Sequence, residues 1–191
     1  VKSSDENVEK FVFKTDKAVY ESVLYKYPTF EKRTVMCVST QSGCPVGCRF
    51  CGAGNYFVKS LTTNEIVGQV VEMMVSRGID HSRVEKGQIM FMSMGEPFLN
   101  WRNVEAAIIQ LHVLYPSFSL LLSTIAPRVD FEPVMTLSAA INSVGLQFSV
   151  HETTDEARNK LMPCAAKYSL SVIARIGTEW RDRTGRKLWL G

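Results

Sequence analysis

The sequence predicts an α/β protein built as an open, partial parallel β/α barrel with about five strands. Short apolar runs alternate with amphipathic stretches along the chain, which is the pattern of parallel βαβ units. The 191 residues, 46% of them hydrophobic, are enough to bury one core. A closed barrel of eight strands typically needs about 250 residues, so this chain predicts a barrel that stays open.

The first half of the chain shows two strands with a helix between them. Residues 34–39 (TVMCVS) read as a strand that leads into a cysteine-rich loop. A capping box at Thr62–Glu65 opens a helix whose apolar face ends near Gly78. That face carries Ile66, Val67, Val70, Val71 and Met74. Residues 88–93 (QIMFMS) form a continuous apolar run, which indicates a strand covered on both faces.

The alternation continues to the end of the chain. A helix is predicted over 103–114, where apolar residues recur at helical spacing before Pro116. The remaining expected elements are strands at 119–123, 146–150 and 187–190 and helices at 132–142, 155–161 and 170–183. We therefore divide the chain into an N-terminal extension over 1–33, of which the first dozen residues look loosely ordered, and a core over 34–191.

Composition indicates a soluble protein of a reducing compartment, and we expect the cytoplasm. Five cysteines, an odd number with three inside one short run, do not resemble a disulfide framework. No stretch approaches the roughly 18 apolar residues of a membrane span, so no membrane partner is expected. The net charge of +3 is too small to establish a nucleic-acid partner by itself.

Three cysteines in the run GCPVGCRFC carry the strongest chemical signal. Cys44, Cys48 and Cys51 place three thiolates on one tight loop, where they can ligate three corners of an iron–sulfur cube. The fourth iron then keeps an open position for a substrate or cofactor. A structural zinc site is the alternative, but it usually needs four closed ligands. The other two cysteines and all three histidines are scattered along the sequence, which favours the cluster.

Polar residues follow the predicted strands at the edge where parallel α/β folds gather functional groups. The carboxylate of Glu96 beside Gly95 could pair with a ligand ammonium by a charge-assisted contact. Taken alone, Gly95-Glu96-Pro97 reads more readily as an ordinary turn, and Ser123 and Ser149 as strand-end caps; it is their placement on one edge that favours a ligand site. Together they form one set: Cys44–Cys51, Ser93–Pro97, Ser123–Thr124 and Ser149–His151.

The cysteine spacing, with Phe50 just before the last cysteine, resembles radical S-adenosylmethionine (SAM) enzymes. From Arg33 to Pro163 the chain further resembles the radical-SAM methyltransferases that methylate adenine in 23S ribosomal RNA and, in some members, transfer RNA. The segments that carry this resemblance are CVSTQSGCPVGCRFC, EIVGQV, MFMSMGEPFLN, LLST and FSVHETTDEARNKLMP.

The resemblance implies roles for named residues. Cys44, Cys48 and Cys51 would ligate a [4Fe–4S] cluster. Residues that match cofactor-binding positions are Phe50, Gly95, Glu96, Ser123, Ser149, Val150 and His151. Glu21 matches the family's proton acceptor, although a solvated hairpin carboxylate reads equally well. Cys37 matches the cysteine that resolves a covalent protein–RNA intermediate, and the alternative is a buried strand cysteine.

The same resemblance implies a reaction and its partners. A radical derived from SAM takes hydrogen from a methylated cysteine, and the methyl carbon then adds to an electron-poor carbon of adenine. Ribosomal RNA or transfer RNA would be the substrate, and flavodoxin or ferredoxin would donate electrons. The methyl-carrying cysteine belongs to the family's C-terminal third, and this sequence stops at Gly191. We therefore expect a shortened relative or fragment that does not complete methyl transfer alone.

Other readings stay open. The radical could serve a substrate that is not RNA. Basic residues crowd the last predicted helix and its exit, but acidic neighbours make a solvated helix face the simpler reading. They are Arg175, Arg181, Arg183, Arg186 and Lys187.

Overall fold

A computed structural model describes residues 6–191. Its main feature is one seven-stranded sheet with the order β1-β2-β3-β6-β7-β8-β9. The first two strands run antiparallel to their neighbours, and β3, β6, β7, β8 and β9 are parallel. The strands of this sheet are β1 Val8–Lys14, β2 Val19–Lys26, β3 Thr34–Cys37, β6 Gly87–Phe91, β7 Ser119–Thr124, β8 Val144–Phe148 and β9 Trp189–Leu190. A separate ribbon pairs β4 Gln41–Gly43 with β5 Phe57–Ser60.

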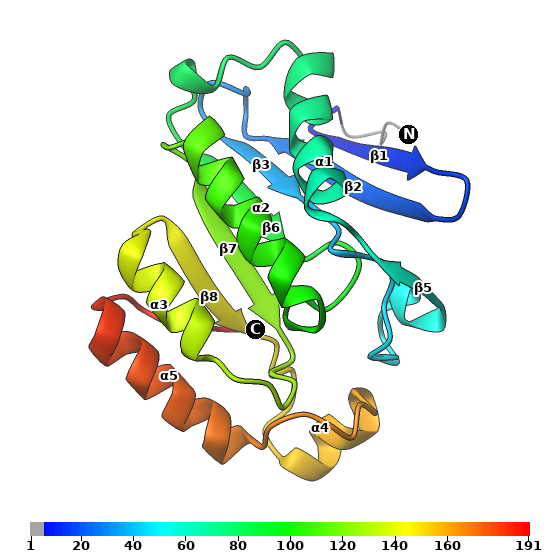
Figure 1. The fold of residues 1–191 in the computed structure, drawn as a ribbon, viewed down its shortest axis with the longest axis vertical. Helices are drawn as coiled ribbons and strands as arrows, with labels where there is room; N and C mark the ends of the chain where they lie inside the picture. The colour runs from blue at the N-terminus through cyan, green and yellow to red at the C-terminus, as the bar shows by residue number, and fades with distance from the viewer. Residues whose placement is uncertain (1–5) are drawn as a thin grey trace.

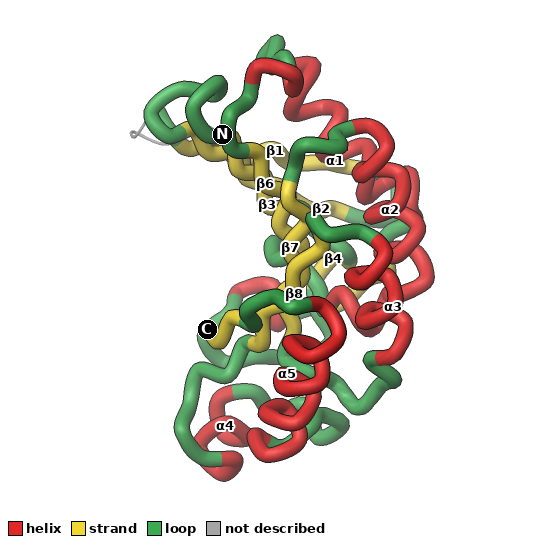
Figure 2. Tube along the Cα trace, turned by 90° about the vertical axis from the view of Figure 1, so that its left-hand side faces the viewer, coloured by secondary structure: helices red, strands yellow, loops and turns green. Residues whose placement is uncertain are grey.

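Helices cover one side of the curved sheet, as Figures 1 and 2 show. The α-helices are α1 Thr63–Ser76, α2 Trp101–Leu114, α3 Glu132–Ala140, α4 Asp155–Leu161 and α5 Leu170–Thr184, and the 3-10 helices are η1 Gly52–Asn55, η2 His81–Arg83 and η3 Pro97–Asn100. In Figure 2, α1, α2, α3 and α5 follow the outer side of the sheet, and among residues 6–191 the opposite side carries none of these four helices. Within residues 6–191, none of the helices combines the length and the apolar character that crossing a membrane requires.

The predicted barrel segment is confirmed, with small shifts at its strand ends. The five parallel strands are those expected from the sequence, and each βαβ helix lies where its periodicity indicates. Strand β8 begins two residues before the prediction and ends at Phe148, so Ser149 and Val150 belong to the loop. The last strand is shorter than predicted, since only Trp189 and Leu190 pair with β8.

The expectation of a loosely ordered start was wrong for residues 8–12, which belong to β1. Strand β1 forms a hairpin with β2 and extends the sheet beyond β3. The phenyl ring of Phe13 stacks on Tyr20, with 5.3 Å between centroids. The alternation of half-buried and exposed residues in β1 explains why a charged segment still pairs as a strand. Residues 1–5, also part of that expectation, lie outside the described residues.

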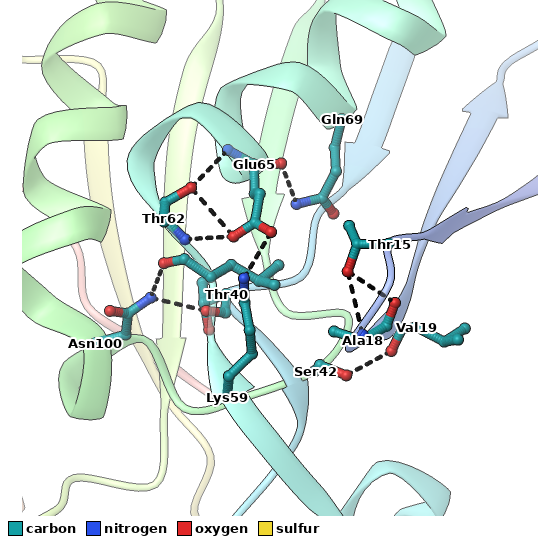
Figure 3. A network of polar contacts seen from close by, with 11 residues as sticks. Thr15, Ala18, Val19, Thr40, Ser42, Lys59, Thr62, Glu65, Gln69 and Asn100 are labelled. Carbon is teal, nitrogen blue, oxygen red and sulfur yellow. Dashed lines mark hydrogen bonds and ion pairs between the residues drawn. The ribbon is translucent and has the colours of Figure 1, made fainter.

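A polar network fixes the N-terminal hairpin to the core. Figure 3 shows two of the contacts in this region, from Gln69 to the Glu65 carbonyl and from Ser42 to the Val19 carbonyl on β2. Gln69 on α1 is fully buried. Its Oε1 accepts hydrogen bonds from Ser22 Oγ (2.5 Å) and from the Ser39 backbone N–H (2.8 Å). Its Nε2 donates to the carbonyls of Ser39 (3.0 Å) and Glu65 (3.1 Å). One side chain thus joins β2, the loop after β3 and helix α1.

Replacing Gln69 with leucine is therefore expected to lower the free energy of unfolding by about 3 kcal/mol, because the Ser22 hydroxyl and both polar groups of the Ser39 backbone lose their partner. Urea unfolding followed by circular dichroism measures this. Gln110→Leu on the exposed face of α2 is the control and should change stability by less than about 0.5 kcal/mol. Equal effects of the two substitutions would contradict the role of the network.

Candidate functional site

One cavity collects most of the predicted site residues at the carboxyl ends of the parallel strands. It has a volume of about 120 Å³. Its wall includes nine of the predicted residues, namely Cys44, Cys48, Phe50, Cys51, Gly95, Glu96, Ser123, Ser149 and His151. They come from the cysteine loop, from the end of β7 and from the segments after β6 and β8. The sequence therefore brings distant segments to one place through the topology of the sheet.

The cysteine loop is fixed at both ends by its backbone. Gly43 closes β4 with φ of 76°, and a side chain there would collide with the Tyr56 carbonyl. The Cys44 N–H donates to that carbonyl at 2.8 Å. Within the loop, the Cys51 N–H donates to the Cys48 carbonyl at 3.1 Å. These contacts hold the three cysteines on one short turn beside the cavity.

Burial controls the chemistry of two of these thiols. It raises the pKa of Cys44 and of Cys48 to about 11, so both are neutral thiols at pH 7 when no metal is bound. Binding a metal would release their protons, since the ligand is the thiolate. Across residues 6–191, no three His, Cys, Asp or Glu side chains converge on a site for one metal ion. An iron–sulfur cube has a different requirement, because each cysteine binds its own iron.

Glu96 lies against the same cavity, but its carboxylate is largely engaged by the protein. Oε1 accepts from the Phe98 N–H (3.1 Å) and from Thr124 Oγ1 (2.7 Å), and Oε2 accepts from the Ile125 N–H (3.0 Å). A carboxylate offers about four acceptor positions, so about one is left for a ligand. Burial raises the pKa of Glu96 to about 7 despite these donors. Glu96 therefore joins the β6 and β7 loops and also borders the cavity.

Comparison with known proteins shows to which family the chain belongs. The family model of the radical SAM superfamily matches residues 38–184. The chain belongs to the radical SAM superfamily. Members of this superfamily use a [4Fe–4S] cluster and SAM, which confirms the expected cofactors at the level of the family.

The relatives of this superfamily member are named as RNA methyltransferases. A probable dual-specificity RNA methyltransferase RlmN of Thermotoga neapolitana is 33% identical over 189 residues, which are 97% of this chain and 53% of the relative. A second protein of that name, from Heliobacterium modesticaldum, is 31% identical to this chain. The matched region covers 96% of this chain and 49% of that relative. The chain thus spans about half the length of these curated relatives.

A solved structure agrees with the fold. The crystal structure of a radical SAM methyltransferase from Sphaerobacter thermophilus matches with a TM-score of 0.82 and 31% identity, over 100% of this chain and 55% of that one. Together with the family model, this match confirms the predicted radical-SAM α/β architecture and the resemblance to the RNA methyltransferases.

The donor set of the cavity fits the cofactors that the radical SAM superfamily uses. Its wall combines the three cysteines with the hydroxyl residues Ser93, Ser123, Thr124 and Ser149 and with apolar residues such as Val46 and Ile125. Ser123 Oγ and Ser149 Oγ lie 3.1 Å apart, so one donates to the other across neighbouring strands. The rings of Phe50 and His151 meet edge to face, with 4.8 Å between centroids. His151 has φ of 58°, an unusual conformation for a residue other than glycine.

Gly95 allows two loops of the radical SAM core to approach closely. Its φ is 101°, and a Cβ atom there would lie 2.7 Å from both Gln41 Cβ and Thr40 Oγ1. We expect Gly95→Ala to reduce the free energy of unfolding by about 3 kcal/mol or more. Gly68→Ala, at an open position on α1, is the matched control and should stabilise by about 1 kcal/mol. Urea titrations of both variants test this, and two stabilised proteins would refute it.

Val150, Cys37 and Glu21 do not line this cavity among the residues that the structure describes. The Val150 N–H donates to the Gly191 carbonyl at 2.8 Å, and its side chain borders a separate apolar cavity with Leu170 and Leu190. Cys37 is half-buried, and burial raises its pKa to about 11. The Glu21 carboxylate forms an ion pair with Lys10 at 2.9 Å.

Cys37 and Glu21 nevertheless share one face of the sheet. Ser22 points toward α1, because it donates to Gln69, so its neighbours Glu21 and Val23 point to the opposite face. Val23 pairs with Cys37 in the register of β2 and β3. Both residues therefore face the side of the sheet opposite α1, α2, α3 and α5 in Figure 2.

The basic residues of the last helix have structural partners in the described chain. Arg183 pairs with Glu132, and Arg181 with its neighbour Asp182 at 3.0 Å. Arg186 donates to the Asn142 and Ser138 carbonyls and lies over the Trp180 ring at 5.3 Å. These contacts agree with the reading of a solvated helix face.

Sequence reasoning missed Met92 at the site and gave Arg158 no role. Met92 lines the cavity because it follows β6 directly, next to the predicted Ser93, and the run MFMS carried this signal. Arg158 stood in the quoted segment FSVHETTDEARNKLMP without an assigned role, and it is buried in the structure. The sequence pattern did not predict that the charged side chain of Arg158 would be buried.

Proposed function

We propose that this chain binds a [4Fe–4S] cluster through Cys44, Cys48 and Cys51 and SAM in the adjacent cavity, as a radical SAM enzyme of the RNA adenine methyltransferase type. The observation that carries the proposal is that these cysteines and residues from the carboxyl ends of three parallel strands line one cavity. When bound, the cluster with SAM supplies a carbon radical that can remove hydrogen from an unactivated C–H bond.

The chain's own residues would position the cofactor. Gly95 offers backbone without a side chain, and the free acceptor position of Glu96 suits an ammonium group. The linked hydroxyls of Ser123 and Ser149 suit polar ribose or carboxylate atoms. The Phe50–His151 ring pair offers an aromatic edge at the mouth of the same cavity. Val150 would contribute backbone beside these two neighbours.

RNA as the substrate rests on the names of the relatives and on the open face of the sheet. Cys37 and Glu21 share that face, which supports their assignment as the resolving cysteine and the proton acceptor. We further propose flavodoxin or ferredoxin as the electron donor and the cytoplasm as the location. The expectation that this stretch alone does not complete methyl transfer stays a prediction.

Electron paramagnetic resonance on anaerobically reconstituted, dithionite-reduced protein tests the cofactor assignment. We expect a reduced-cluster signal whose shape changes when SAM is added. A signal that is indifferent to SAM would reject the SAM site, and zinc without iron after anaerobic preparation would reject the cluster. Binding of ribosomal RNA fragments at rising salt separates RNA from other substrates, because phosphate contacts weaken steeply with salt.

A further inference from the structure

Two buried cations lie close to the cysteine loop. Arg158 on α4 is 1% exposed, and Lys167, between α4 and α5, is 6% exposed. The end of α4 is fixed to the cysteine loop, since the Arg49 N–H donates to the Leu161 carbonyl at 2.9 Å. Cys44, Cys48 and Cys164 pack on one apolar group made by Val46, Ile125 and Met162.

The described hydrogen bonds of both cations go to neutral oxygens. Arg158 donates to the carbonyls of Tyr168 (2.7 Å) and Ile125 (2.5 Å). Its Nε is buried and has no partner among residues 6–191. Lys167 Nζ donates to Asn159 Oδ1 and to the Cys164 carbonyl. None of these acceptors carries a negative charge.

Burying these two cations costs free energy unless an anion lies nearby, because a buried charge loses its hydration. Burial lowers the pKa of Arg158 and of Lys167. For both cations, the negative charges of Asp155 and of a Cys48 thiolate act in the opposite direction and raise the pKa. One Asp155 oxygen already accepts from the Leu170 N–H at 2.9 Å. Cys48 binds a metal as its thiolate, so a cluster on the cysteine loop would place an anion near these cations.

We propose that Arg158 and Lys167 are the positive counterpart of the cluster, placed to stabilise its thiolate ligands and above all its reduced state. The proposal rests on the cluster assignment made above. Three thiolates make the ligated assembly anionic, and reduction adds one more electron to it. A fixed positive charge near Cys48 stabilises the added negative charge of the reduced cluster. In a buried place few solvent dipoles screen this interaction. The two cations would thereby raise the reduction potential of the cluster.

The test is a redox titration of the reconstituted protein with dithionite, followed by electron paramagnetic resonance. We expect Lys167→Met and Arg158→Met each to lower the ratio of reduced to oxidised cluster at a fixed potential roughly tenfold, which is about 59 mV for one electron. Lys160→Met is the matched control. Lys160 lies on α4, the helix of Arg158, but is exposed and paired with Glu156 at 2.7 Å. The cluster of Lys160→Met should therefore have the same reduction potential as the cluster of the unaltered protein.

Stability of the metal-free chain gives a second readout. If Lys167 serves the cluster, Lys167→Met should raise the urea midpoint of the metal-free protein, because an uncompensated buried charge is removed. A purely structural lysine would give a lower midpoint and an unshifted potential, and that pair of results would overturn the proposal. If Arg158→Met does not fold, Lys167→Met decides alone.

The outcomes also separate this inference from the proposed function. Unaltered protein that forms no cluster would overturn both. A normal cluster in the unaltered protein, with unshifted potentials in both variants, would overturn only the role of the two cations.

Discussion

Cys48→Ser is expected to leave the chain folded but to reduce its iron content after anaerobic reconstitution at least roughly tenfold, from about four irons per chain. Cys48 stands between the other two cysteines of the loop, so its loss leaves two thiolates that cannot hold a cube. Serine keeps the size and the backbone of the residue but is a poor ligand for iron. Iron and sulfide analysis measures the effect, and circular dichroism confirms the fold.

Cys164→Ser is the matched control for this prediction. Cys164 packs against the same apolar group as Cys44 and Cys48 but lies outside the cavity wall. Its variant should retain the full iron content. Equal iron in Cys48→Ser and Cys164→Ser would show that the loop is not the cluster site. Equal losses in both would show that a fourth cysteine is needed, as in a closed zinc-type site.

The second large effect is a pH dependence of stability that comes from Glu96. Its pKa rises from 4.5 in the ordinary state to about 7 in the folded chain, chiefly because of burial. The folded protein therefore binds this proton more tightly than the unfolded chain does. Stability from this group is fully present below about pH 4.5 and is lost as the pH rises to about 7, and the loss amounts to about 3 kcal/mol.

Urea midpoints of the metal-free protein between about pH 5 and about pH 8 test this effect. Other groups also titrate in this range, so the difference between the unaltered protein and Glu96→Gln is the informative quantity. The variant cannot titrate at this position and should show a flatter profile. Parallel profiles would mean that the three donors to Glu96 hold it ionised in the fold.

The sequence was most informative where chemistry and topology coincide. Cysteine spacing predicted the loop, and the ends of parallel strands predicted that Gly95, Ser123 and Ser149 would lie beside it. The β1–β2 hairpin escaped prediction because Glu9, Lys10 and Lys14 interrupt its apolar alternation, and only pairing with a neighbour makes such a segment a strand.

Two other features depend on three-dimensional burial and therefore could not be predicted from residue types. Glu96 matches a ligand position in sequence, yet Thr124 and two backbone N–H groups occupy most of its oxygens. Arg158 and Lys167 read as surface cations on a short helix and its exit, and the structure encloses them. The spacing of charged residues along the sequence does not show which of them the surrounding loops will bury.

Strand β7 has a consequence for which sequence changes this fold tolerates. Leu120, Leu122 and Thr124 are buried, while Leu121 and Ser123 are half-buried on the other face. Core residues thus alternate with residues of the opposite face, of which Ser123 borders the site cavity. Inserting or deleting one residue here would exchange the two sets, sending serine into the apolar core and leucine to the opposite face. Length variation among related chains should therefore fall in the surface connections, and the strands should keep a constant length.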